Sequence, residues 1–218
     1  MTARELLDGG AEKLARGELK EQPEVRAALL DTTGRVYEAL GLYDKAEPLL
    51  REGLAIRRRT LGEHRDVAAS LNNLAHLLRE KGDYTGAEGM YREALAMRRK
   101  LLGNDHPVVA DSLIGLGSLL VKRGDARQAE PMLVEALHIR ERALPKGHPD
   151  LAAARSALGE CFTALGRYKE AEPLLAESYA VLQSKVSEKS LVLRATRDRL
   201  ARLYEAWGKP AQAVKYRG

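Results

Sequence analysis

Apolar residues recur along the chain at the three- and four-residue spacing of amphipathic helices, and the same arrangement returns several times. The segment from His64 to His106 returns in edited form from His106 to His148, a step of 42 residues each time. One such copy cannot bury its own apolar face, so copies must stack on one another. The pattern therefore predicts a repeat array built from helices.

A glycine ends the first predicted helix of each copy, and fixed positions around it predict how the two helices of a copy pack. The glycines are Gly41, Gly82, Gly124, Gly166 and Gly208. Five residues later stands an alanine, and seven residues earlier a small residue, namely Gly34, Ala75, Gly117, Gly159 and Ala201. Small residues let two helix axes approach closely, so each copy is predicted to be helix, tight turn, helix.

The alignment divides the chain into a leading segment and five copies. Residues 1–22 are expected to form one or two helices that cap the first copy. The copies span approximately 23–63, 64–105, 106–147, 148–189 and 190–218, the last of them truncated. The predicted fold class is all-α, a right-handed α-solenoid of antiparallel helix pairs.

The last two copies depart from the others at one packing position. The first three copies have leucine there, at Leu30, Leu71 and Leu113, whereas the last two have Arg155 and Arg197. Looser packing is expected at this position, or arginine stems that run along the apolar surface to reach water.

The spacing of the small residue, the large residue, the glycine and the alanine resembles the tetratricopeptide repeat, whose usual period is about 34 residues. The longer period and the segment LNNLAHLLREKGDYTGAEGMYREALAMRRKLLGNDHP resemble the kinesin-light-chain type. The resemblance covers roughly residues 23–218. It implies a non-enzymatic scaffold that binds an extended peptide or partner segment in a concave groove.

The opening residues are also similar to repeat regions of bacterial serine/threonine protein kinases. The chain has no complete kinase motif of its own. HRD occurs at residues 64–66, but Leu71 stands where the kinase catalytic loop has asparagine, and there is neither a glycine-rich loop nor DFG. The alternative function is therefore a regulatory or sensor arm of such a kinase.

No pattern of residues predicts catalysis, a metal site or a cofactor. His64, His106 and His148 occur once per copy, too far apart to share a zinc ion, and are interpreted as residues at helix starts. The single cysteine, Cys161, falls at a leucine position of other copies and is predicted to be a small buried hydrophobe. No apolar run is long enough for a signal peptide or a membrane span, so a cytoplasmic protein without a membrane partner is expected.

The net charge of +5 is concentrated at one end of the chain. Residues 191–218 contain seven basic and two acidic residues, and the remaining 190 residues sum to zero. A basic end suits an acidic peptide as well as phosphate, and aromatic residues are too few for a base-stacking surface. Nucleic-acid binding by the last copy is thus a disfavoured alternative, and self-association through the terminal repeats is a further expectation.

The predicted partner-binding residues lie on the first helix of each copy, which lines the concave side of such arrays. These positions differ between copies, whereas the packing positions hardly do. The candidates are Asn72, Asn73, His76, Arg79, Ile114, Ser118, Val121, Lys122, Glu160, Arg199 and Arg202.

Two groups of these candidates suggest different contacts. The resemblance implies that Asn72 and Asn73 help to hold extended peptides, although the LNNLA segment is equally well explained as repeat consensus. Ile114, Gly115, Ser118 and Val121 are expected to form a small, partly apolar pocket for one hydrophobic anchor.

Overall fold

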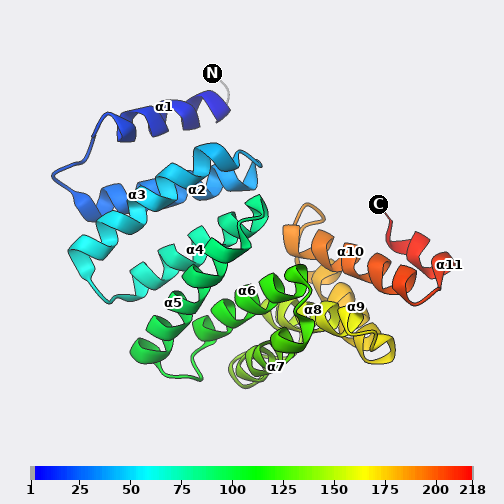
Figure 1. Cartoon of the computed structure of the whole chain (residues 1–218). Coiled ribbons are helices and arrows are strands. Elements are labelled where there is room, and N and C mark those ends of the chain that lie inside the picture. Colours follow the sequence, from blue (N-terminus) through cyan, green and yellow to red (C-terminus); the bar gives the residue numbers. More distant parts are fainter. Residues whose placement is uncertain (1–2, 218) are drawn as a thin grey trace. The chain divides into compact units, whose positions relative to one another are not determined.

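The computed structural model describes residues 3–217, with side chains from residue 5 onward (Figure 1). Residues 1 and 2, the start of the predicted cap, and Gly218 lie outside the described residues. Residues 3–217 contain eleven α-helices and one 3-10 helix, and no strand. The all-α prediction is therefore confirmed. The chain divides into two compact units, Met1–Asn104 and Asp105–Gly218.

The first unit contains five helices, of which the last four form two pairs. They are α1 (Ala3–Ala15), α2 (Pro23–Ala39), α3 (Tyr43–Leu61), α4 (Arg65–Lys81) and α5 (Tyr84–Leu102). Helix α2 packs against α3 and α4 against α5, and α3 also packs against α4. The unit is a stack of helix pairs with α1 at one end.

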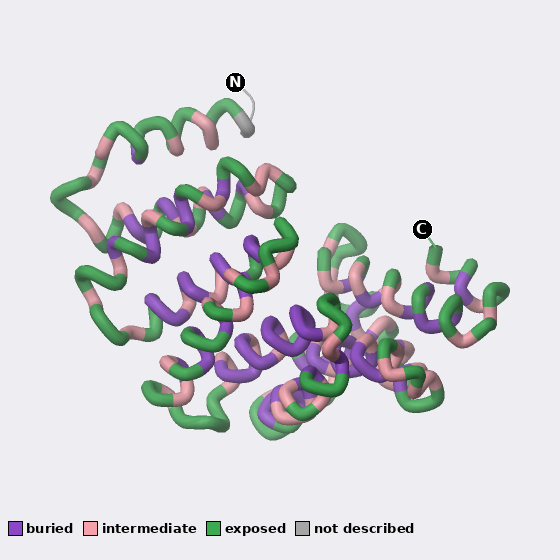
Figure 2. The backbone as a smooth tube through the Cα atoms, in the orientation of Figure 1, coloured by how far each residue is buried: buried purple, intermediate pink, exposed green. Residues whose placement is uncertain are grey.

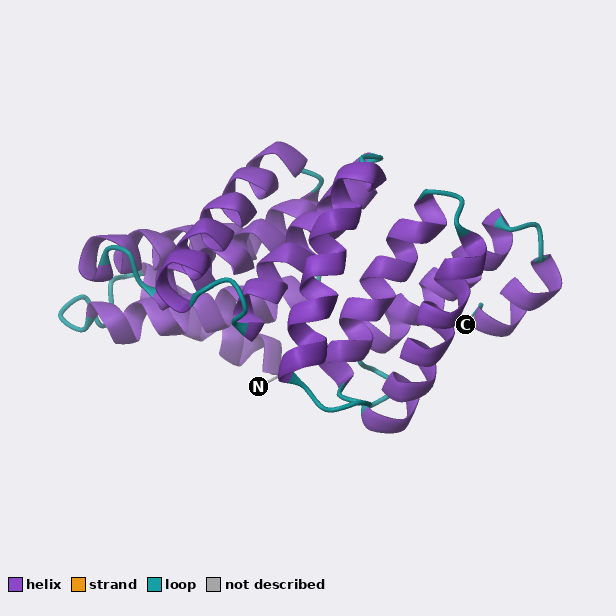
Figure 3. Ribbon diagram, turned by 90° about the horizontal axis from the view of Figure 1, so that it is seen from below, coloured by secondary structure: helices purple, strands orange, loops and turns teal. Residues whose placement is uncertain are grey.

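The second unit continues the same scheme with shorter elements at its end. Its helices are α6 (Pro107–Arg123), α7 (Ala126–Ala143), α8 (Pro149–Ala164), α9 (Tyr168–Lys185), α10 (Leu191–Ala206), α11 (Pro210–Ala213) and the 3-10 helix η1 (Val214–Tyr216). Short loops join the helices (Figure 3). Two helices fall within each of the first four predicted copies, and the last copy contains α10, α11 and η1. The five-copy boundaries themselves stay a prediction.

The repeated small residues lie where helices approach most closely. The five predicted alanines are all 0 % exposed: Ala46, Ala87, Ala129, Ala171 and Ala213. A Cβ atom on Gly117 would stand 2.6 Å from Cγ of Leu133, and one on Gly159 would stand 2.7 Å from Cγ of Leu175. Gly34 faces Leu50 in the same way, so the first, third and fourth copies each pack a leucine of the second helix onto a glycine of the first, and the predicted close approach is confirmed in them.

Histidines and glycines set the helix ends as the sequence predicts. Nδ1 of His64 accepts a hydrogen bond from the Asp66 amide at 3.2 Å, and His148 does the same for Asp150 at 3.1 Å. His106 caps α6 in the same way. At the other end of α4, Gly82 has a φ of 87°, a left-handed conformation that glycine adopts without strain.

The predicted cap is a single helix, α1, that covers only part of α2. Arg26 donates a hydrogen bond from Nη2 to the carbonyl of Leu14 at 3.1 Å. Asp8 accepts from the Tyr37 hydroxyl at 2.5 Å and pairs with Lys45 at 2.8 Å. Most of α1 remains exposed (Figure 2).

An apolar stripe on α2 stays in contact with water. Val25, Leu29, Val36 and Leu40 are 47 %, 42 %, 40 % and 55 % exposed. The residues at the Val36 position of the other copies are all 0 % exposed: Leu77, Leu119, Cys161 and Leu203. Cys161 contacts the preceding helix pair through the carbonyl of Ala126 on α7, whereas α1 leaves the Val36 position on α2 open.

Cys161 is a core residue, as predicted. It is 0 % exposed, and its thiol donates a hydrogen bond to the Ala126 carbonyl at 3.3 Å. Burial raises the pKa of the Cys161 thiol to about 11. The thiol is therefore protonated at neutral pH and unsuited to nucleophilic chemistry.

Candidate functional site

In the first unit, the predicted candidate Asn73 is engaged by the neighbouring first helix. Its Nδ2 donates to both carboxylate oxygens of Asp31 on α2, each at 3.2 Å. Arg57 lies 3.6 Å from the same carboxylate and also bonds the Ser70 hydroxyl. The Asn73 amide is therefore oriented by Asp31, and its carbonyl oxygen stays without a hydrogen bond from residues 5–217.

His76 is the most accessible of the first unit's candidates. Its Nδ1 lies in hydrogen-bond contact with Oε1 of Glu38 on α2. The Glu38 side chain is 14 % exposed, whereas that of His76 is 48 % exposed. Because an ionised carboxylate only accepts, Nδ1 must carry the proton. Glu38 thus fixes the ring and leaves Nε2 without a partner among the described side chains.

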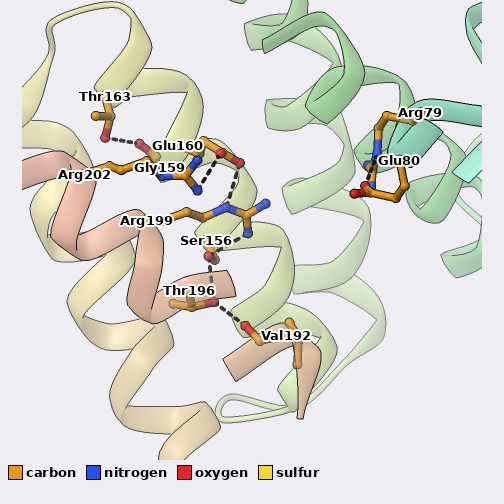
Figure 4. Close-up of polar contacts among 10 residues, drawn as sticks. All are labelled: Arg79, Glu80, Ser156, Gly159, Glu160, Thr163, Val192, Thr196, Arg199 and Arg202. Carbon is orange, nitrogen blue, oxygen red and sulfur yellow. Dashed lines mark hydrogen bonds and ion pairs between the residues drawn. The ribbon is translucent and has the colours of Figure 1, made fainter. Parts of the chain in front are cut away.

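Arg79 is largely withdrawn from solvent, in contrast to His76. Its side chain is 13 % exposed, and its Nε donates to Oε1 of the adjacent Glu80 at 3.0 Å (Figure 4). Nearby, burial raises the pKa of the Tyr91 hydroxyl to about 12. Asn72 is half-buried. Arg79 therefore contributes little accessible surface.

In the second unit, one carboxylate on α8 gathers two arginines of α10. Oε2 of Glu160 accepts from Nε of Arg199 at 2.7 Å, and Oε1 lies 3.3 Å from Nη2 of Arg202 (Figure 4). The side chains of Glu160 and Arg199 are 19 % and 16 % exposed, whereas that of Arg202 is 61 % exposed. The structure thus brings three predicted candidates together and presents one of them to solvent.

A buried pair of hydroxyl groups, on Ser156 and Thr196, holds a second nitrogen of the Arg199 guanidinium group. Its Nη1 donates to the Ser156 hydroxyl at 3.0 Å, and Ser156 and Thr196 hydroxyls lie 2.9 Å apart. Thr196 in turn donates to the carbonyl of Val192 at 2.8 Å. Ser156 and Thr196 are both 0 % exposed. Arg199 is therefore a positioning residue, held on two sides.

The candidates on α6 differ in accessibility. Ser118 is 7 % exposed and belongs to the packed side of the helix. Ile114 and Val121 are half-buried, and Lys122 is exposed. The hydrophobic-anchor pocket therefore stays a prediction that rests on Ile114 and Val121.

The sequence spacing of the hydrogen-bonded side chains on adjacent first helices is close to the repeat period. Asp31 and Asn73 are 42 residues apart, Glu38 and His76 are 38 apart, and Glu160 and Arg199 are 39 apart. Residues one period apart lie on adjacent first helices. Complementary polar side chains at this spacing could have predicted these hydrogen-bonded pairs, which comparison of equivalent positions alone does not predict.

The described part of the chain shows neither a metal-binding cluster nor a membrane-spanning helix. Residues 3–217 contain no group of three or more histidine, cysteine or acidic side chains placed to bind a metal. None of the described helices is both long enough and apolar enough to cross a bilayer.

Comparison with known proteins places the repeat pattern in a family. The tetratricopeptide-repeat profile matches residues 24–100, 66–142, 119–184 and 150–216. No curated protein sequence matches the chain significantly.

Solved structures with a similar fold include repeat proteins of the same kind. The nearly identical repeats of a kinesin light chain from Podospora anserina superpose with a TM-score of 0.69 at 26 % identity, covering 90 % of this chain and 93 % of theirs. BtubC (BKLC) from P. vanneervenii gives a TM-score of 0.74 at 21 % identity, over 99 % of this chain and 89 % of its own. YrrB, described as having an unusual peptide-binding site, gives 0.51 at 17 % identity over 94 % and 89 %.

Proposed function

Because this chain belongs to the tetratricopeptide-repeat family, we propose that it is a non-enzymatic scaffold that binds an extended peptide or partner segment along its first helices. Tetratricopeptide repeats commonly mediate protein–protein or peptide interactions. The likeness to the kinesin-light-chain type supports the same role. The kinase arm, the cytoplasmic location and self-association through the terminal repeats stay predictions.

One observation carries this proposal. In both units a largely withdrawn carboxylate on one first helix holds a more exposed hydrogen-bonding side chain on the next, Glu38 with His76 and Glu160 with Arg202. His76 and Arg202 each stand one residue after the small packing residue of their copy, at Ala75 and Ala201. The same register therefore presents an oriented polar group in both units.

Such pairs favour binding because they reduce the entropy lost when a partner arrives. Ordering a long polar side chain at an interface costs about 0.5–1.5 kcal/mol, and a side chain that is already held by a neighbour has less freedom left to lose. The nitrogen atoms of Arg202 that are not used by Glu160 can donate to backbone carbonyls or carboxylates of an extended peptide. The carbonyl oxygen of Asn73 supplies an acceptor for a peptide N–H.

The test begins with selection of peptide ligands from a random displayed library on the intact chain. The affinity of a selected peptide is then measured by fluorescence anisotropy for the variant His76→Ala/Arg202→Ala. We expect binding to weaken at least about tenfold, since each lost charge-assisted hydrogen bond is worth about 1.5–3 kcal/mol.

The matched control is His138→Ala/Arg127→Ala. It removes the same two residue types from exposed positions on a second helix, α7. The control should bind like the parent, and both variants should keep the parent's helical content and melting temperature. Equal loss in the two variants, or no loss in the first, contradicts the proposed binding faces.

A further inference from the structure

A second polar site lies between α9 and α10, on a different side of α10 from Glu160. It is a pocket with a volume of about 400 Å³. Its lining residues come from α9, α10 and the loop between them: Tyr179, Gln183, Glu188, Lys189, Leu193, Arg194 and Arg197. Arg199 and Arg202 instead pair with Glu160 on α8. The pocket is therefore separate from the proposed binding faces.

Arg197, one of the lining residues, lacks the ion-pair partners of its counterpart one period earlier. Arg155 lies 3.2 Å from a carboxylate oxygen of Glu141 and 3.9 Å from one of Glu177. The residue at the Glu141 position of the next copy is Gln183, which carries no charge. The side chain of Arg197 makes no ion pair or hydrogen bond with any residue in 5–217, and its Nε is buried without a partner.

The pocket as a whole carries excess positive charge. Arg194 and Lys189 have no ion pair with the described residues either, so three cations stand against the single carboxylate of Glu188. Desolvating a guanidinium without a partner is unfavourable, and an anion that enters the pocket removes this penalty. The same packing position holds leucine in the first three copies, so the fold itself does not need an arginine here.

The remaining lining selects among anions. Leu193 is 6 % exposed and packs with the buried Leu182, which gives the pocket an apolar wall. Such a wall suits the methylene stem of a glutamate side chain better than a bare inorganic ion. Glu188 repels a second negative charge, which disfavours a dianionic phosphate.

We infer that this pocket binds the carboxylate of a glutamate side chain from an acidic segment of a protein partner, with Arg197 as its principal ligand. This inference rests on the proposed function, because it assumes a protein partner. Gln183 and Tyr179 supply neutral hydrogen-bonding groups beside the guanidinium. The ring of Tyr179 packs edge-on against Tyr216, with centroids 5.6 Å apart, which limits its movement.

The experiment measures binding of fluorescein-labelled octaglutamate to the intact chain by fluorescence anisotropy at low salt. The decisive variant is Gln183→Glu, which installs the carboxylate found at Glu141 and so neutralises Arg197 from within. We expect it to weaken octaglutamate binding about tenfold or more, and Arg197→Gln to do the same. The control Arg127→Gln removes one exposed positive charge on α7 and should leave binding unchanged.

The inference is overturned if Gln183→Glu binds octaglutamate like the parent chain, or if Arg127→Gln weakens binding as much. It is also overturned if an octathymidylate binds more tightly than octaglutamate and Gln183→Glu weakens that binding, because the pocket then prefers phosphate. A library-selected peptide whose binding depends on His76 and Arg202 but not on Gln183 would leave the proposed function standing while this inference fails.

Discussion

Gly117 and Gly89 give opposite predictions for the same substitution, because only one of them lies at a helix crossing. Both are helical glycines, in α6 and α5 respectively. A Cβ atom on Gly117 would stand 2.6 Å from Cγ and 2.7 Å from Cδ2 of Leu133, closer than van der Waals contact allows. A Cβ atom on Gly89 would have no non-local atom within 4 Å.

The magnitudes follow from two opposing effects. Replacing a helical glycine by alanine favours folding by about 1 kcal/mol at most. At Gly117 this gain is opposed by overpacking, which typically costs about 1–3 kcal/mol, and Leu133 is 0 % exposed and has no solvent side to move into. Gly89→Ala should therefore raise the free energy of unfolding by about 0.5–1 kcal/mol, and Gly117→Ala should lower it by up to about 2 kcal/mol.

Urea denaturation followed by far-UV circular dichroism measures both changes, with the slope of the transition as a check on the denatured state. A double-mutant cycle isolates the contact. Leu133→Ala alone should lower the free energy of unfolding by about 2–5 kcal/mol. In that background Gly117→Ala should become stabilising. If Gly117→Ala stabilises the parent chain as much as Gly89→Ala does, the helix crossing is not as close as described.

Three further predictions concern burial. Cys161 should react with a thiol reagent only when the protein unfolds. Its thiol has a pKa of about 11 in the fold against 9.0 when free, so the unfolded state loses this proton first and the free energy of unfolding should fall as the pH rises from about 9 to 11. A pH series of urea midpoints would show this fall. Leu77→Glu should prevent or severely weaken folding, whereas Val36→Glu, at the same register but 40 % exposed, should change the melting temperature little. Arg140→Ala should lower the free energy of unfolding by about 1–3 kcal/mol, because its guanidinium lies 2.9 Å from Asp150 and its side chain is 9 % exposed; an unchanged urea midpoint would show that this pair is unimportant.

The packing of this protein was predictable because the repeat supplies its own internal comparison. Glycine, alanine and histidine stand at fixed offsets in most copies, and each offset has one structural reason, a close helix crossing or a helix end. The burial of Cys161 followed from the leucines at its position in other copies. Local chemistry was thus enough to predict the helix pairs.

The polar faces were less predictable, because they depend on how one pair is rotated against the next. Asn73 stays a predicted peptide contact, and the sequence did not predict that its amide donates to Asp31 on the neighbouring helix. Arg79 also stays a predicted contact, and the sequence did not predict that its side chain donates to Glu80 and is only 13 % exposed. The rotation of one helix pair against the next decides which side chains of a first helix are exposed. The spacing of residues within one copy does not specify this rotation.

The most direct test of the central claim is amide chemical-shift mapping of a library-selected peptide on the isotope-labelled chain. We expect the largest shifts on first helices, around His76 in α4 and Arg202 in α10. The second helices α5 and α7 should change little. Largest shifts on α5 or α7, with α4 and α10 unchanged, would contradict a scaffold that binds its partner along the first helices.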